Sequence, residues 1–202
     1  MVAFEYTPGL AGELDPQAQL ILGQLAASGK QIVVVSQYAA GLGQANSLGL
    51  DVAATQFIPG ETIGLRALAA CLNGSSDCFT LFGSGGPLLL APGEVGLIVV
   101  LTGERDSLLG WMEQVAPQTE NIPLVVGTTQ GLAPLAQPYL GSQQIDGLIA
   151  GLPGAAAYEM ALTGETGVVG KQLQAQALAQ LLIVILLLVG AVYYALTGLS
   201  RK

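Results

Sequence analysis

The sequence predicts an α/β protein, with a doubly wound, mainly parallel sheet followed by one C-terminal transmembrane helix. Short apolar strands alternate with helical segments, a pattern that is typical of βαβ units. Segments 31–36 (QIVVVS) and 95–101 (VGLIVVL) are apolar on both faces, as expected of strands that helices cover from both sides. The third observation is an uncharged apolar segment, 177–199, near the end of the chain.

The membrane helix is predicted from a segment that begins at Ala177, ends at Leu199 and contains neither charge nor proline. A helix of about 23 residues reaches ~34 Å, enough to cross a hydrocarbon core of ~30 Å. Tyr193 and Tyr194 lie near its far end, and such rings favour the membrane interface. We therefore expect this segment to contact membrane lipid as a single-pass helix. The alternative is a buried core helix.

The first half of the chain predicts three strands separated by helices. The strands are expected at residues 2–6, 31–36 and 55–58. The first helix is expected to begin at an Asp15 N-cap, with Pro16 at its first helical position, and to end at Gly29. Two further helical segments are expected at 38–51 and 61–72. A long loop rich in glycine and proline is expected at 73–94.

The second half repeats the alternation. Strands are expected at 95–101, 122–127 and 145–149, and helices from Asp106 or Ser107 to Pro117, at 132–140 and at 154–162. Right-handed crossovers would make this a flavodoxin-like or Rossmann-like sandwich. The predicted organisation is an α/β domain (1–163), a linker and juxtamembrane segment (164–176), the membrane helix (177–199) and a basic tail (200–202).

The distribution of charge bears on partners and on topology. Residues 1–170 hold all 14 acidic residues and only three basic ones, a net charge of −11, which disfavours nucleic-acid partners. Arg201 and Lys202 follow the membrane helix, whereas Lys171 alone precedes it closely. Because Lys and Arg mark the cytoplasmic side, we expect a cell-membrane protein with a cytoplasmic C-terminus and an extracytoplasmic domain. The alternative is a tail-anchored chain with a cytoplasmic domain, because no export signal precedes the first strand.

Several kinds of chemistry are disfavoured by the sequence. There is no histidine, so Ser-His-Asp and Cys-His catalysis and imidazole zinc sites are excluded. The segment TPGLAGE after the first strand lacks both GxGxxG and a Walker lysine, and no metal motif is present, so we expect neither cofactor nor metal. Cys71 and Cys78 flank LNGSSD and form either a small disulfide loop or two free thiols, depending on the compartment.

Candidate binding residues follow from the expected topology. Ligands of such sheets bind beyond the carboxyl ends of the strands, where the strand order reverses. The residues expected there are Glu5, Thr7, Ser36, Glu61, Thr102 and Thr128. The hydroxyl groups among them alternatively cap helices and turns. Glu5 is unusual because a carboxylate in a central strand is costly to bury. The alternative interpretation pairs it with Lys30 or Arg66, or places it at the open edge of the sheet.

Four stretches together resemble an uncharacterised family of bacterial membrane-anchored proteins. They are VAFEYTPGLAGELDPQAQ, FIPGETIGLRALA, IDGLIAGLPGAAAYEMAL and LQAQALAQLLIVILLLVG. The family pattern places an acidic residue in the first strand, a Pro-Gly turn before the third helix and a GL-x-GAA-x-YE segment before the membrane helix. Here these positions are Glu5, Pro59 with Gly60, and 151–159. The resemblance implies the architecture, together with an N-terminal membrane helix that this chain does not show, and it implies no activity.

We expect a binding or assembly module, a subunit or accessory protein of a membrane complex, in preference to an enzyme. Its partner would be a membrane protein or a second copy of the chain, because Gln180 and Gly190 offer polar and small contacts between helices in a bilayer. One alternative is an envelope hydrolase with Glu5 and Glu61 as its acid and base. Another is nucleotide or flavin binding by analogy of fold.

Overall fold

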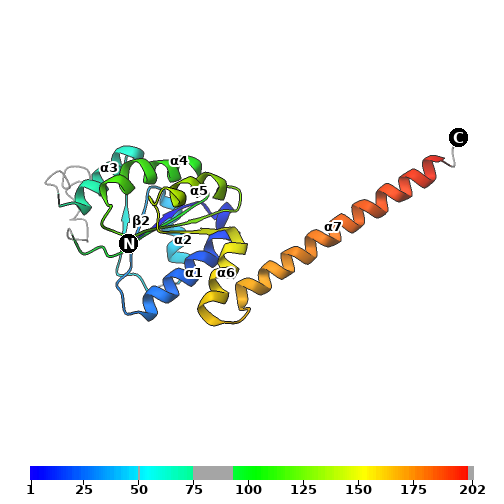
Figure 1. Cartoon of the computed structure of the whole chain (residues 1–202), viewed down its shortest axis with the longest axis horizontal. Coiled ribbons are helices and arrows are strands. Elements are labelled where there is room, and N and C mark those ends of the chain that lie inside the picture. The colour runs from blue at the N-terminus through cyan, green and yellow to red at the C-terminus, as the bar shows by residue number, and fades with distance from the viewer. Residues whose placement is uncertain (50, 75–92, 200–202) are drawn as a thin grey trace. The chain divides into compact units, whose positions relative to one another are not determined.

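A computed structural model describes residues 1–49, 51–74 and 93–199, the last five of these by their backbone alone (Figure 1). Its centre is a six-stranded sheet in the order β3-β2-β1-β4-β5-β6, in which every neighbouring pair is parallel. The strands are β1 (Val2–Glu5), β2 (Val33–Ser36), β3 (Ala54–Phe57), β4 (Ile98–Thr102), β5 (Leu124–Thr128) and β6 (Gly147–Ala150). The predicted doubly wound parallel sheet is confirmed, with the strand order of the Rossmann fold.

Helices connect the strands in the expected alternation. They are α1 (Ala11–Ala27), α2 (Ala39–Ser47), α3 (Glu61–Leu72), α4 (Arg105–Gly110), α5 (Ala133–Gly141) and α6 (Gly151–Thr163). A π-helical stretch, η4 (Trp111–Val115), and a 3-10 turn, η5 (Ala116–Gln118), prolong α4, and a 3-10 turn, η1 (Pro8–Leu10), precedes α1. The chain divides into two compact units, Met1–Ala155 and Ala156–Lys202.

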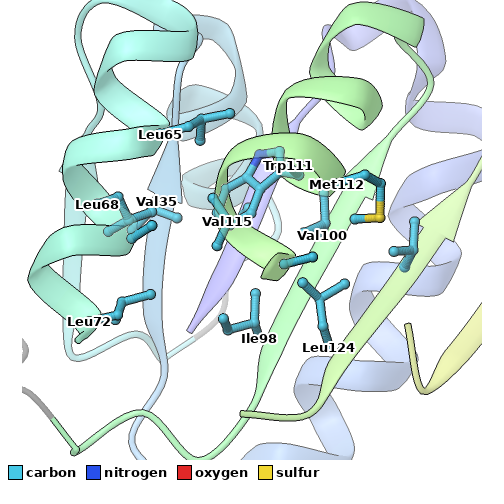
Figure 2. Packing of buried hydrophobic residues seen from close by; sticks show 14 of the residues in the cluster. Val35, Leu65, Leu68, Leu72, Ile98, Val100, Trp111, Met112, Val115 and Leu124 are labelled. Atoms are coloured by element: carbon cyan, nitrogen blue, oxygen red, sulfur yellow. The ribbon is translucent and has the colours of Figure 1, made fainter. Parts of the chain in front are cut away.

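Two layers of helices enclose the sheet of the first unit. Helices α3, α4 and α5 and the π-helical stretch cover one face, where their apolar side chains form a single buried cluster with those of the strands (Figure 2). Trp111 is completely buried there, among Val35, Leu68 and Val100. Helices α1 and α2 contact the strands from the other face, on which Phe4 and Val34 are buried. Each strand of the centre is therefore shielded on both sides, which explains its continuous apolar sequence.

The predicted start of the first helix is wrong. Helix α1 begins at Ala11, so that Asp15 and Pro16 lie inside it. The carboxylate of Asp15 does not cap the helix: its Oδ1 accepts a hydrogen bond from the Tyr6 hydroxyl (2.8 Å) and its Oδ2 accepts one from Gln44 Nε2 (2.7 Å). An aspartate followed by proline resembles a helix start in sequence, but here a buried tyrosine uses the carboxylate as its acceptor.

The second unit contains the rest of α6 and a 32-residue helix, α7 (Val168–Leu199). The stretch Val168–Tyr194 of this helix is long and apolar enough to cross a membrane, and its most apolar part is not covered by protein. Helix α7 begins well before Ala177, so part of the expected linker is helical. Most of the predicted loop 73–94 lies outside the described residues. The predicted disulfide partner Cys78 lies outside them as well.

Replacing Leu68 by alanine should destabilise the first unit strongly. Leu68 is fully buried in α3, so Leu68→Ala removes apolar contacts and leaves a cavity at a cost of about 2–5 kcal/mol. The matched control is Ile63→Ala on the same helix, since Ile63 is 66% exposed and its loss should change stability by less than about 0.5 kcal/mol. Denaturant unfolding of the full chain in detergent, followed by fluorescence of Trp111, measures both. Equal losses in the two variants would contradict the assigned core.

Candidate functional site

The strand order reverses between β1 and β4, and the candidate site lies at the carboxyl ends of these strands. Glu5 is in register with Thr102 on β4, and Thr102 is in register with Thr128 on β5. Residues in register point to the same face of a sheet, so these three side chains form a row across three neighbouring strands. All three are fully buried. The row lies on the face that α4 covers, since Ala3, Val100 and Val126, two residues before each of them, belong to the buried cluster on that face.

The other three predicted residues lie apart from this row. Ser36 ends β2 and is buried, and its hydroxyl bonds Phe4 O (2.6 Å) and the backbone of Tyr38. It therefore fixes the turn after β2, as the capping alternative predicted. Thr7 is exposed before the 3-10 turn η1, and Glu61 is exposed at the first residue of α3. The structure thus brings together Glu5, Thr102 and Thr128.

Glu5 is buried and has no basic partner among the residues that the structure describes. Its two carboxyl oxygens face the backbone N–H of Gln37, at 3.1 and 3.4 Å. Burial raises the pKa of Glu5 to about 7, although the hydrogen bond from the Gln37 amide and the nearby indole N–H of Trp111 act to lower it. Neither Lys30 nor Arg66 forms a salt bridge with it in the described part of the chain, so the predicted alternative pairing is wrong for these residues.

Buried polar groups of α4, of η4 and of the row itself lack hydrogen-bond partners among the described residues. The indole N–H of Trp111 acts to lower the pKa of Glu5. It makes no hydrogen bond of normal geometry with any described residue. Figure 2 shows the indole nitrogen at the end of the ring nearer the N-terminus of α3, the side where the strands end. Ser107 Oγ, one helical turn before Trp111, and Thr128 Oγ1 also lack hydrogen-bond partners among the described residues. Glu5 therefore has a further N–H donor close by, which would favour its ionised form.

Three exposed carboxylates lie around Tyr38, just outside the row: Glu61, Glu104 and Asp106, which we call the acidic rim. The pKa of Tyr38 is raised first by burial and then by the negative charges of Glu5, Glu104, Glu61 and Asp106. None of these acids forms a salt bridge within residues 1–49, 51–74 and 93–199. The carboxyl edge therefore concentrates negative charge around one half-buried phenol, and Arg105 is the basic residue between Glu104 and Asp106 in the sequence.

The backbone at Glu61 is strained. Gly60 has φ 85° and Glu61 has φ 49°, so two consecutive residues are left-handed at the start of α3. Glycine adopts this conformation freely, whereas a glutamate does so at a cost. Strain of this kind is concentrated at functional sites. Its sequence signal was the Pro59-Gly60 turn, which predicted a helix start but not the conformation of Glu61.

Four residues at the carboxyl edge of the sheet are not among the predicted site residues: Tyr38, Trp111, Glu104 and Asp106. In the sequence, Tyr38 falls in the predicted helical segment 38–51, and Trp111 falls in the predicted helix that ends at Pro117. Tyr38 follows the end of β2 by two residues, so the rule that selects Ser36 also reaches it. Glu104 and Asp106 follow the end of β4 in the same way, but the sequence has no metal motif that would single them out.

Other features of the first unit bear on its chemistry. A hollow of about 860 Å³ opens at the opposite, amino end of the strands, between Lys30, Ala53 and Glu94, and is remote from the predicted residues. No group of three or more acidic or cysteine residues in the described chain is placed to hold a metal ion. Cys71 is buried in α3, and its predicted disulfide with Cys78 stays a prediction.

A comparison with families of proteins, with curated proteins and with solved structures found no match for this chain. The resemblance to a family of membrane-anchored proteins therefore stays a prediction. The two features that it assigned to the first unit now have a structural setting: Glu5 is the buried end of β1, and Pro59 with Gly60 leads into the strained start of α3.

Ionisation of Glu5 should destabilise the fold. The pKa of Glu5 rises from 4.5 to about 7 on folding. Its stabilising contribution to the free energy of unfolding is therefore fully present below pH 4.5 and is lost as the pH rises through about 7. A pKa unit corresponds to about 1.4 kcal/mol, so the loss is on the order of 3 kcal/mol. Glu5→Gln keeps an acceptor for the Gln37 amide but cannot ionise, and should abolish this loss. Unfolding of the full chain in detergent between about pH 4 and 8.5 measures it. A difference between wild type and variant that does not depend on pH would contradict the assignment.

Proposed function

We propose that this protein is a membrane-tethered, non-catalytic binding module whose acidic rim docks a basic segment of a partner protein. The observation that carries the proposal is the set of unpaired carboxylates around Tyr38 at the point where the strand order reverses. Ligands of doubly wound sheets bind at this point. Surface carboxylates that form no salt bridge within the chain can gain from a partner that supplies lysine or arginine.

Several observations favour a basic protein segment over other ligands. A net charge of −11 before the membrane helix opposes the approach of nucleic acids and nucleotides. Tyr38 presents an aromatic ring beside carboxylates, and a guanidinium or ammonium group contacts both favourably. The acidic groups lie at the end of β1 and in the segments after β3 and β4, and Tyr38 follows β2, which suits an extended partner.

The hydrolase and cofactor alternatives have less support. An acid–base pair of Glu5 and Glu61 would require both carboxyl groups to reach one glycosidic bond, but Glu5 is fully buried whereas Glu61 is exposed. The segment between β1 and α1 is a short 3-10 turn that begins with Pro8, and it lacks the glycine pattern of a phosphate-binding loop. Neither alternative has an observation of its own in its favour.

Helix α7 is the proposed tether, spanning the membrane between Ala177 and Leu199. Arg201 and Lys202 favour a cytoplasmic C-terminus and an extracytoplasmic domain. In the bilayer, Gln180 and Gly190 lie on the same side of an ideal helix, since ten residues at about 100° each bring them within roughly 80°. A polar amide and a glycine on one side suit contact with another membrane helix, either of a partner or of a second copy.

The orientation is testable in intact cells. A short epitope tag placed after Lys202 should resist a protease added outside spheroplasts, while the α/β domain is digested, because the basic tail is retained inside. Permeabilised cells, in which the tag should be lost, are the control. In the tail-anchored topology with a cytoplasmic domain, the tag would instead lie outside and be digested while the α/β domain is protected.

Neutralising the acidic rim should weaken the binding of a basic peptide. The full chain in lipid nanodiscs is titrated with a Lys/Arg-rich peptide, and the double variant E104Q/D106N should lower the affinity roughly tenfold if each charge contributes up to ~1 kcal/mol. The matched control, E113Q/E120Q, removes the same charge from exposed residues that do not influence Tyr38. Equal weakening in both variants would show unspecific attraction and would refute the proposed docking surface.

A further inference from the structure

The connection between α6 and α7, within the second unit, is built from directional contacts. Helix α6 ends at Thr163, and Gly164 has φ 75°. The Thr163 hydroxyl donates to Glu159 O (2.9 Å) and Glu165 O (3.0 Å), and it accepts from the backbone N–H of Glu165. The Gly164 N–H donates to Met160 O (2.8 Å). The turn is thus fixed by hydrogen bonds that satisfy the end of α6.

The side chain of Glu159, on α6, completes the first turn of α7. Its Oε1 accepts the backbone N–H of Val169 (3.2 Å), and its Oε2 accepts that of Gly170 (2.9 Å). The first amides of a helix lack partners inside the helix and are normally bonded by a Ser, Thr, Asp or Asn immediately before it. In α7 that position is Gly167, which has no side chain, so a residue of the preceding helix supplies the cap.

The space around this carboxylate is closely fitted. Glu159 is only 6% exposed, and a Cβ atom built on Gly167 would overlap its carboxyl group. Burial opposes ionisation of Glu159, but the backbone amides of Gly170, Val169, Val168 and Gly167 together hold the pKa below its usual value. A carboxylate therefore stands at the positive end of α7, whose own first turn contains no acidic residue and is followed closely by Lys171. Its charge complements the helix dipole.

We infer that Glu159 is a cap shared by two helices, which locks the start of the membrane helix to α6 and makes their connection a rigid joint. A cap taken from the sequence of α7 itself would stabilise α7 alone. A cap taken from α6 adds two hydrogen bonds that break if the two helices turn relative to each other. The joint therefore transmits the orientation of α6 to the helix that enters the membrane, which a flexible linker would not do.

The joint is tested on the full chain in lipid nanodiscs with two measurements. Hydrogen exchange reports the amides of Val169 and Gly170, and spin labels on unnatural amino acids at Ala157 and Gln174 report the distance between α6 and α7. Glu159→Ala should raise exchange at both amides at least tenfold and broaden the distance distribution. Glu165→Gln, which removes a charge from the same turn but no acceptor bonded to α7, should change neither. Unchanged exchange and distances in Glu159→Ala would overturn the proposal.

A second variant separates the cap from the joint. Adding Gly167→Ser to Glu159→Ala places an ordinary N-cap hydroxyl where the carboxylate was, so exchange should return toward the wild-type value while the distance distribution stays broad. A narrow distribution in this double variant would show that helix capping alone orders the connection and would refute the shared cap. If Glu159→Ala does not fold, Glu159→Gln, which leaves one carbonyl oxygen for two amides, carries the same test with the same expected directions.

Discussion

Strand β1 has a neighbouring strand on each side and helices over each face, so every atom of its side chains must be accommodated inside the protein. Val2, Ala3 and Phe4 meet this constraint by being apolar. Glu5 meets it at an energetic cost, because a carboxyl group at that place loses its water and gains one backbone amide in exchange. The indole N–H of Trp111 adjoins this enclosed group, whereas the hydroxyl of Thr102 bonds the backbone of Glu104.

Much of the fold follows from local sequence. The apolar runs in β2, β4 and β5 predicted buried parallel strands, and the alternation with helices predicted the two helical layers. Helix boundaries were less predictable where tertiary contacts competed with local signals. Asp15 looks like an N-cap in sequence, but the buried hydroxyl of Tyr6 takes it as an acceptor, and α1 begins earlier. A helix start depends on which partner a carboxylate finds, and that partner can be distant in the chain.

The candidate site was predicted in part. The rule that ligands bind at strand ends selected Glu5, Thr102 and Thr128, and the register of β1, β4 and β5 places them side by side. The gathering of Glu61, Glu104 and Asp106 around Tyr38 could not be predicted, because it depends on the order of the strands. Only when β4 lies beside β1 do the segments after β2, β3 and β4 meet at one edge. No local pattern in the sequence encodes this order.

The pairing of β1 with β4 also has a consequence for synthesis. Residues 2–5 leave the ribosome well before residues 99–102, which are their hydrogen-bonding partners on one side. The intervening chain supplies β2 for the other side alone. Until β4 emerges, the nascent chain therefore presents an apolar strand with an open row of N–H and C=O groups, which can template pairing with another chain. Tunnel walls or a chaperone that shield this edge would favour native closure of the sheet.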